Sequence, residues 1–354
     1  NSPCVDDIIY SCRNSGGKRL LMNKKPTIRD VAAKAGVSIA TVSKFINSTQ
    51  RFTAAVERKI QAAIDELAYH SNPLARSMIT GKTGSVGVAI LDIANPHFTS
   101  MVKGANRVAL EHGYNLLFVD TEENQAREDE LLGALSRRVD GLIVSSRMPE
   151  EQMDRILALG KPVVFSGRPA PAGVPSIGVD AYAAAYMIGE LLVKQGHRKI
   201  GLLGSQPDGY PSIRERRKGY MRALKHHHIH ESFIEDSPLI REAVYDAALR
   251  LLRRCPEITA IFACNDNVAV GVIHAAHDLG RDVPGDLSLV GFDDTDLASE
   301  IKPALTTVYV AKLLLGSTAV RLLRDRSEDP YRTCITATLA TRLVIRDSVR
   351  PLKL

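Results

Sequence analysis

The chain has 354 residues, of which 45% are hydrophobic and 24% are charged, and its mean hydropathy is close to zero. This length and balance predict a globular protein of two or three domains. No apolar run reaches the roughly 18 residues of a membrane span, and no secretion signal precedes the first ordered pattern, so we expect a cytoplasmic protein. The five cysteines are an odd number without the spacing of a disulfide framework, which favours reduced thiols.

The net charge of +6 is concentrated near the N-terminus. Residues 22–83 contain ten Lys and Arg against four Asp and Glu, whereas the rest of the chain is nearly neutral. A basic segment of this size favours a polyanion as partner, although solvated basic surface is the alternative on charge alone. Residues 1–21 lack any such pattern, and we expect them to be a disordered extension before a natural start at Met22.

The stretch from Thr27 to Asn47 predicts two short helices. Thr27 and Asp30 have the spacing of a capping box, Gly36 ends the first helix, and Ser38 is a suitable N-cap for the second. Apolar residues at helical spacing give both helices an inward face, and a third helix is expected from Thr53. This pattern predicts a helix-turn-helix domain, with an ordinary three-helix domain as the alternative.

The outward face of the second predicted helix carries side chains suited to DNA. Ile39 and Ala40 can contact thymine methyls, and Lys44 can donate to guanine O6 and N7. Ser38, Thr41 and Ser43 are candidates for phosphate contacts. The candidate DNA-binding residues of this domain are Thr27, Ser38, Ile39, Ala40, Thr41, Ser43, Lys44 and Asn47.

Residues 72–85 predict a hinge helix followed by a linker. Asn72 and Pro73 begin the helix, and Leu74, Ala75 and Met78 give it one apolar edge, which makes these three further candidates for DNA contact. So short a helix is not stable alone in water, so we expect it to fold only against DNA and a partner copy. Residues 81–85 are expected to form a flexible tether.

From residue 86 onward the pattern changes to short apolar strands that alternate with helices such as 98–111 and 126–137. Such alternation predicts a parallel, doubly wound sheet, and its restart after residue 199 predicts a second sheet. Two such lobes are expected to hold a ligand in the cleft between them. The predicted strands are 86–93, 114–120, 141–146 and 162–167 in the first lobe, and 199–205, 260–266 and 288–294 in the second.

Several motifs in a fixed order carry a family resemblance that covers Met22 to about Ser348. They are TIRDVAAKAGVSIATVSKFIN, NPLARSM, RRVDGLIVSS, QGHRKIGLLG, CNDNVAVG, VPGDLSLVGFDD and PALTTV. The chain resembles the LacI/GalR family of bacterial transcription regulators. The resemblance implies a core like that of periplasmic binding proteins and a homodimer on a near-palindromic operator. Met78 stands where many relatives place a leucine that wedges into the minor groove.

The resemblance also implies which residues bind the effector. It places Asp293 and Arg216 on the ligand, with Asn265 at another strand end and Phe98 as a stacking face. Arg168 matches a common family arginine, although the FSGRP segment lacks the aspartate often found before it. From the residues alone, the Asp293 and Asp294 pair could also serve a metal, acid–base chemistry or a helix cap.

The expected domains are a helix-turn-helix domain over 22–71, a hinge and linker over 72–85, and a two-lobed core over 86–350. Lobe 1 is expected over about 86–181 and 310–337, and lobe 2 over about 182–309 and 338–350. The fold class is therefore a small all-α helix-turn-helix domain followed by an α/β core of two doubly wound parallel-sheet lobes. Without a leucine heptad tail, a dimer is expected rather than a tetramer.

The sequence predicts a ligand-responsive repressor of carbohydrate-utilisation genes. Its effector is expected to be a sugar or sugar phosphate, with a purine or nucleoside as the alternative. A solute-binding protein is the second class considered, and the helix-turn-helix argues against it. No enzymatic activity and no cofactor are expected, because no catalytic constellation recurs. The HHHIH run at 226–230 has no second ligand cluster in the sequence, so no metal is expected there.

Overall fold

The protein is described by a computed structural model over residues 26–47, 49–70, 77, 81–149, 152–205, 210–231, 233–329 and 333–352. The chain divides into two compact units, one ending at Thr80 and the other beginning at Gly81. The predicted extension 1–21 and the hinge residues Leu74, Ala75 and Met78 lie outside the described residues. None of the helices within the described ranges combines the length and the apolar character that crossing a membrane requires.

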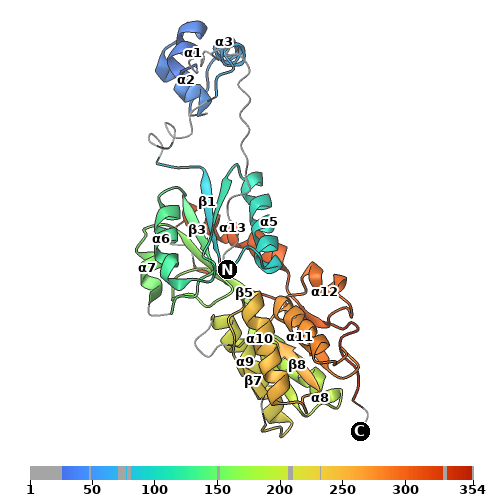
Figure 1. Ribbon diagram of the computed structural model, residues 1–354. Coiled ribbons are helices and arrows are strands. Elements are labelled where there is room, and N and C mark those ends of the chain that lie inside the picture. The colour runs from blue at the N-terminus through green and yellow to red at the C-terminus, as the bar shows by residue number, and fades with distance from the viewer. Residues whose placement is uncertain are drawn as a thin grey trace, which may run out of the picture. The chain divides into compact units, whose positions relative to one another are not determined.

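Within residues 26–47 and 49–70, the first unit contains the three helices that the sequence predicts: α1 (Ile28–Ala35), α2 (Ile39–Ile46) and α3 (Ala54–Glu66) (Figure 1). The Asp30 carboxylate accepts hydrogen bonds from the N–H of Thr27 at 2.8 Å and from its hydroxyl at 2.7 Å, which fixes the start of α1. Gly36 ends this helix with a positive φ of 65°, where glycine carries no steric cost. The buried core of the domain is Val31, Ala32, Ala35, Val42, Ile60 and Ala63.

The first lobe of the second unit is built on a six-stranded parallel sheet, in the order β11-β5-β4-β3-β1-β2. Figure 1 shows α6 and α7 on one side of this sheet and α5 with α13 on the other. The strands are β1 (Ser85–Ile90), β2 (Asn115–Asp120), β3 (Gly141–Val144), β4 (Val163–Ser166), β5 (Ser176–Val179) and β11 (Thr336–Leu339). The helices are α5 (Pro96–Glu111), α6 (Gln125–Ser136), α7 (Met153–Leu157) and α13 (Lys312–Glu328).

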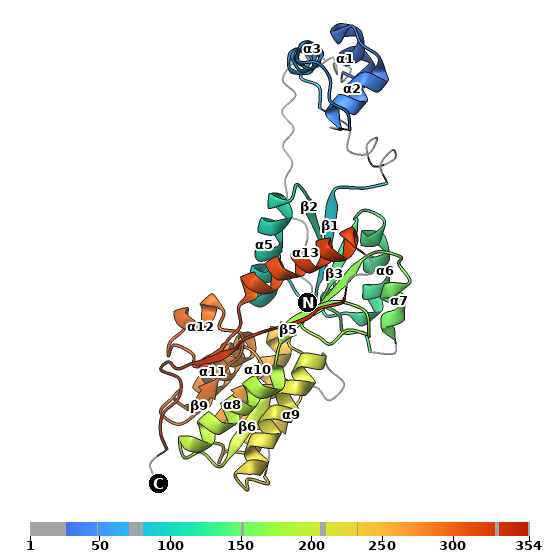
Figure 2. The same ribbon diagram turned by 180° about the vertical axis from the view of Figure 1, so that it is seen from behind.

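The second lobe has a four-stranded parallel sheet in the order β7-β6-β8-β9. Figure 2 shows α8 and α9 together on one side of it, with α10 and α11 behind. The strands are β6 (Ile200–Leu203), β7 (Phe233–Glu235), β8 (Ala260–Ala263) and β9 (Ser288–Val290). The helices are α8 (Ala181–Lys194), α9 (Pro211–His226), α10 (Arg241–Arg254) and α11 (Asp266–Asp278).

Alternating strand residues divide the core of each lobe into two layers, as the pleat requires. In the first lobe, Val88 and Ile143 pack toward α5 and α13, whereas Ala89 and Leu142 pack toward α6 and α7. All four are fully buried. The central strands are therefore apolar on both faces, which explains why they appear in the sequence as continuous apolar runs.

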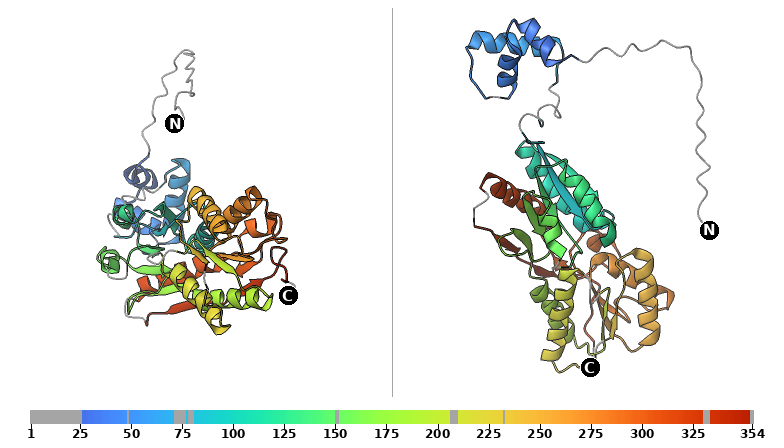
Figure 3. Two further views of the ribbon diagram at one scale, coloured as in Figure 1. Left: turned by 60° about the horizontal axis from the view of Figure 1, so that its bottom comes forward. Right: turned by 90° about the vertical axis from the view of Figure 1, so that its left-hand side faces the viewer.

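The chain passes between the lobes three times, and Figure 3 shows from two further sides how close the lobes lie within this unit. The passages follow β5, β10 (Thr307–Tyr309) and β11, and the last leads into β12 (Arg342–Val344), which pairs antiparallel with β10. The short helix α12 (Asp296–Glu300) lies between β9 and β10. The carboxyl ends of both parallel sheets thus face the junction, the place where open α/β sheets bind ligands.

The linker differs from the sequence expectation at its C-terminal end. The Asp140 carboxylate accepts hydrogen bonds from the N–H groups of Thr83, at 2.6 Å, and Gly84, at 2.9 Å. Ser85 already belongs to β1. The chain is therefore fastened to the first lobe before residue 86, because a loop carboxylate satisfies backbone groups that the sequence pattern leaves without partners.

Candidate functional site

A cavity lies between the two lobes at the carboxyl ends of their strands. Four predicted effector residues line it: Phe98 from the first lobe, and Arg216, Asn265 and Asp293 from the second. The structure brings these side chains together from α5, from α9 and from the ends of two strands. Arg168 does not line this cavity.

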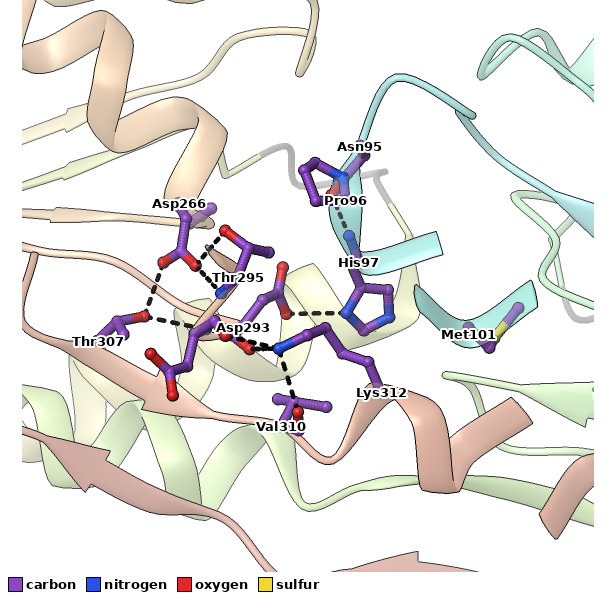
Figure 4. Close-up of polar contacts among 12 residues, drawn as sticks. Asn95, Pro96, His97, Met101, Asp266, Asp293, Thr295, Thr307, Val310 and Lys312 are labelled. Atoms are coloured by element: carbon purple, nitrogen blue, oxygen red, sulfur yellow. Dashed lines mark hydrogen bonds and ion pairs between the residues drawn. The ribbon is translucent and has the colours of Figure 1, made fainter. Parts of the chain in front are cut away.

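Asp293 is the most enclosed charge of this cavity, with 3% of the residue exposed. Its Oδ1 lies 3.3 Å from Nδ1 of His97 and 3.4 Å from Nη2 of Arg216. Burial raises the pKa of a carboxyl, but the charges of His97 and Arg216 outweigh it and hold the pKa of Asp293 below its ordinary value. Asp293 is therefore an ionised hydrogen-bond acceptor at neutral pH, joined to both lobes (Figure 4).

Arg216 is positioned by three neighbours and still has a free donor. Its Nη1 donates to the carbonyl of Cys264, its Nη2 donates to Asp293, and its guanidinium carbon lies 3.6 Å from the ring centroid of Phe292. Its Nε is buried and has no hydrogen-bond partner among the residues that the structure describes. An unsatisfied buried donor is costly, so this atom is a natural contact for a ligand acceptor.

The backbone that presents Asp293 is strained. Asp293 and Asp294 have positive φ angles of 106° and 50°, a backbone conformation that residues other than glycine rarely adopt. Lys312, at the start of α13 in the first lobe, donates to the carbonyl oxygens of Asp293 at 2.7 Å and Asp294 at 2.6 Å. The ammonium group therefore holds this turn in place from the opposite lobe (Figure 4).

A second contact joins the lobes beside the cavity. The hydroxyl of Tyr210, just before α9, donates to the carbonyl of Ser166 at 2.7 Å. Sequence analysis missed Tyr210, His97 and Lys312. His97 lies in the first turn of α5, after the N-cap Asn95 and Pro96, and this helix-start pattern could have been recognised in the sequence. Tyr210 and Lys312 give no comparable local signal.

Two polar residues singled out in the sequence have other partners in the structure. Arg168 is buried, and its Nη1 donates to the carbonyls of Ser146 at 3.2 Å and Met148 at 2.6 Å, so its charge supports a loop of the first lobe. Asp294 does not cap the following helix: Thr295 is the N-cap of α12, and Asp294 accepts from Arg346 at 2.7 Å. Both side chains are used by partners remote in sequence, which local patterns cannot reveal.

Asn265 caps a helix and also borders the cavity. Its side-chain carbonyl accepts from the N–H of Val268 at 2.8 Å and caps α11. Its side chain also borders the cavity, where the NH₂ group is the donor it can offer. Phe98 packs edge-on against His97, with ring centroids 5.1 Å apart, and contributes an apolar wall.

Asp266, next to Asn265, lies behind the cavity wall with 1% of the residue exposed. Its carboxylate accepts from the N–H of Thr295 at 2.7 Å, from the Thr295 hydroxyl at 3.0 Å and from the Thr307 hydroxyl at 2.7 Å. Burial, followed by the negative charge of Asp293, raises the pKa of Asp266 to about 7. The sequence analysis did not single out this residue.

In the helix-turn-helix unit, α2 presents the predicted DNA-reading side chains outward. Ile39 is 46% exposed, and Ala40 and Lys44 are exposed as well. Lys44 donates to the side-chain carbonyl of Gln50 at 3.0 Å. Ser38 caps α2 by accepting from the N–H of Thr41 at 3.0 Å.

The remaining candidate residues of this unit are less available for contact with DNA. The Thr27 hydroxyl is bound to Asp30, and the Asn47 amide donates to the carbonyl of Ser43 at 2.9 Å. Thr41, Ser43 and Asn47 are half-buried. These side chains would have to exchange or share these bonds in order to contact phosphates.

Comparison with known proteins agrees with this arrangement. Residues 27–72 match the bacterial regulatory proteins of the lacI family, and residues 190–349 match a periplasmic binding protein-like domain. Catabolite control protein A of Priestia megaterium is 33% identical over 329 residues, which cover 92% of this chain and 99% of that protein. The transcriptional repressor PurR of Photobacterium profundum is 32% identical over 332 residues, with 92% and 99% covered.

Further relatives and solved structures have the same architecture. The ribose operon repressor of Halalkalibacterium halodurans is 32% identical over 326 residues, covering 92% of this chain and 97% of that protein. The Lac repressor dimer bound to operator and an anti-inducer superimposes with a TM-score of 0.82 at 27% identity, covering 92% of this chain and all of that one. The transcriptional regulator CelR in complex with cellobiose gives 0.69 at 27% identity, with 91% and 99% covered.

A helix-turn-helix unit followed by a two-lobed ligand-binding core defines a class of DNA-binding transcriptional regulators, which are not enzymes. The chain belongs to the LacI family of these regulators. The fold predicted from the sequence is confirmed.

Asp266→Asn is predicted to change how stability depends on pH. Between the ordinary carboxyl pKa of 3.8 and about 7, folded Asp266 keeps a proton that the unfolded chain releases. The free energy of unfolding of the wild type therefore contains a contribution that is complete below pH 3.8 and is lost as pH rises through 7. Asparagine can keep the hydrogen bonds, because its carbonyl accepts from Thr295 and its NH₂ donates to Thr307.

We expect the variant to lack this loss and to gain stability relative to the wild type between pH 5 and pH 8. Urea denaturation at both pH values measures the difference. Asp296→Asn, which changes an exposed carboxylate on α12, serves as the control and should leave the pH profile unchanged. Parallel profiles for the wild type and Asp266→Asn would contradict the raised pKa.

Proposed function

We propose that the protein is a repressor of carbohydrate-utilisation genes whose operator affinity is changed by a sugar or sugar phosphate held between the two lobes. The observation that carries the proposal is the buried pair of Asp293 and Arg216 at the cavity, with Nε of Arg216 left without a partner among the described residues. A carboxylate acceptor beside a planar donor suits vicinal hydroxyl groups. The effector-binding residues in this proposal are Phe98, Arg216, Asn265 and Asp293.

The effector class is supported by two further features. Phe98 and Tyr210 give the cavity apolar walls among its polar groups, a combination typical of small-molecule sites. Among the relatives, one is named a ribose operon repressor and CelR was solved with cellobiose, whereas another is named PurR. A purine or nucleoside is therefore the second candidate.

A thermal-stability screen with sugars, sugar phosphates, purines and nucleosides separates these candidates. A ligand present at 100 times its dissociation constant adds about 2.7 kcal/mol to the free energy of unfolding. Stabilisation by a sugar or sugar phosphate supports the proposal. Stabilisation by purines or nucleosides alone would replace it with the second candidate.

The mechanism couples the cavity to DNA through the two lobes. In the form described here His97 and Lys312 of the first lobe contact the Asp293 turn of the second. An effector that competes for Asp293 changes these contacts and with them the relative free energies of the lobe arrangements. Coupling of roughly 1 to 3 kcal/mol, about 5- to 150-fold in operator affinity, is ordinary for such regulators.

At the operator, we propose that two chains act together. Each α2 enters the major groove, and the hinge segment with Leu74, Ala75 and Met78 folds in the minor groove between them. In this proposal the hinges fold only on DNA, so the free energy of ordering them is part of operator affinity and depends on how the two cores hold the linkers.

The homodimer needs an interface on the core, and the exposed edge of the first sheet is our candidate. Strand β2 has a sheet neighbour on one side only, and its Leu117 and Phe118 are 38% and 47% exposed. Unpaired edges with exposed apolar side chains are unusual on monomers and favour association.

Lys44→Ala tests base reading. Removing the ammonium group is expected to relax the preference at one symmetric operator position and to cost about 1 to 3 kcal/mol per base contact. Selection from a randomised operator library measures this. Lys59→Ala, which removes the same charge from the exposed face of α3, is the control and should keep the wild-type consensus. The same consensus for Lys44→Ala would show that Lys44 reads no base.

Asp293→Ala and Arg216→Ala test effector binding. Each is expected to weaken effector binding by about 1.5 to 3 kcal/mol, because a charge-assisted hydrogen bond in a closed site is lost. Operator binding without effector should persist, because Lys312 still holds the turn at residues 293–294 through its backbone carbonyls. Calorimetric titration and operator binding with and without effector provide the measurements.

Two variants complete this experiment. Asp293→Asn keeps an acceptor of the same shape and is expected to retain more effector affinity than Asp293→Ala, and Asp296→Asn should behave as the wild type. Normal effector affinity in Asp293→Ala or Arg216→Ala would remove that residue from the site. Loss of operator binding without effector would contradict the separation of the two functions.

Phe118→Glu tests the dimer interface. A carboxylate at this edge would be desolvated in an interface, so the variant is expected to shift toward monomer and to lose operator affinity. Sedimentation equilibrium and operator titration measure both effects. Ile345→Glu, at a side chain that is 60% exposed after β12, is the control. A fully dimeric Phe118→Glu protein would exclude β2 from the interface.

A further inference from the structure

Two helices of the second lobe pack closely enough to bring side chains from different segments together. A Cβ on Gly219 of α9 would lie 2.0 Å from the carbonyl oxygen of Tyr182 in α8, so the close approach depends on glycine. Figure 2 shows the two helices side by side. The approach places Glu190 of α8 beside the C-terminal end of α9, where the histidine run begins.

Glu190 converges with two of these histidines. Its Oε1 lies 2.6 Å from Nε2 of His227 and 3.4 Å from Nδ1 of His226, and the three ligand atoms all lie within 4.8 Å of one another. Lys194, one turn further along α8, lies 3.3 Å from Oε2 of Glu190. This leaves Oε1 directed at the histidines. The sequence offers no second ligand for this run, and the structure supplies one from another helix.

We propose that Glu190, His226 and His227 form a binding site for a divalent transition metal, with Zn²⁺ as the best match. Two imidazole nitrogens and a carboxylate oxygen are a known set of three protein ligands for zinc, whose fourth position is taken by water. Tetrahedral ligands at about 2.1 Å from the metal lie about 3.4 Å apart. The separations of Oε1 from the two ring nitrogens lie within 1 Å of that spacing.

The site is accessible and its charges suit a cation. The side chain of His226 is 61% exposed and that of His227 is 30% exposed, so both rings can turn without disturbing the core. Glu190 supplies the acidic ligand of the set, and Lys194 engages only its other oxygen, Oε2. The hydroxyl of Tyr186 lies 2.6 Å from Nδ1 of His226, a hydrogen bond that the metal would replace.

The alternative is a hydrogen-bonded cluster that fastens α8 to α9 without metal. The two interpretations differ in one respect that can be measured. A metal site binds one ion per chain and stabilises the folded protein increasingly as the metal concentration rises above its dissociation constant, whereas a hydrogen-bonded cluster does neither. The three ligands do not line the effector cavity, although His226 lies on the same helix, α9, as Arg216. Metal binding would therefore be an input separate from effector binding.

The experiment uses full-length protein without an affinity tag. Equilibrium dialysis against Zn²⁺, with Mg²⁺ as the control ion, gives affinity and stoichiometry, and thermal unfolding gives the stabilisation. We expect one Zn²⁺ per chain and a higher melting temperature with Zn²⁺ only. Glu190→Gln and His227→Ala should each weaken Zn²⁺ binding by about 10-fold or more and abolish the stabilisation.

His228→Ala and His230→Ala are the matched controls, because they remove histidines of the same run that are not part of the cluster. Both should bind Zn²⁺ like the wild type. Circular dichroism of the metal-free variants establishes that they fold. The proposal is overturned if the wild type binds no Zn²⁺, if Glu190→Gln binds normally, or if the controls lose binding as much as His227→Ala does.

Discussion

The buried carboxylate of Asp293 is the interaction on which the arrangement of the ligand-binding core depends. It is nearly inaccessible to water, the guanidinium of Arg216 from its own lobe balances its negative charge, and the ring of His97 from the other lobe lies beside it. A buried charge is stable only where such partners are present. Its backbone has a strained conformation that Lys312 holds from the first lobe. At Asp293, therefore, a buried ion pair, a strained backbone and hydrogen bonds between the lobes occur together.

This arrangement makes the cavity sensitive to a ligand. At Asp293, and at Nη1 and Nη2 of Arg216, binding exchanges existing hydrogen bonds for new ones, whereas Nε of Arg216 has no partner among the described residues and can gain one. The exchange includes contacts between lobes, such as that of Tyr210 with Ser166, and a ligand that replaces them unequally shifts the balance of lobe arrangements. The raised pKa of Asp266 has the same origin, because it shares this poorly solvated region with the Asp293 charge.

Close helix packing has a comparable effect on the far side of the second lobe. Glycine lets α8 and α9 approach until Glu190 meets His226 and His227. The histidines by themselves form an ordinary exposed run, and the carboxylate by itself is an ordinary helix residue. Only their proximity gives the ligand set that we propose for a metal, at the end of the helix that carries Arg216.

Local sequence patterns were enough to predict the features that depend on residues close in the chain. The cap of Thr27 with Asp30 and the N-cap at Ser38 join residues three positions apart, and the alternation of strands and helices follows from local periodicity. The family motifs also pointed to Asp293 and Arg216. The partners of Asp293 and Arg216 follow from tertiary packing, as does the position of Arg168 outside the cavity lining. The contact of Glu190 with His227, which are 37 residues apart, also depends on that packing. Such contacts depend on how whole helices and sheets pack, and no local pattern encodes that distance.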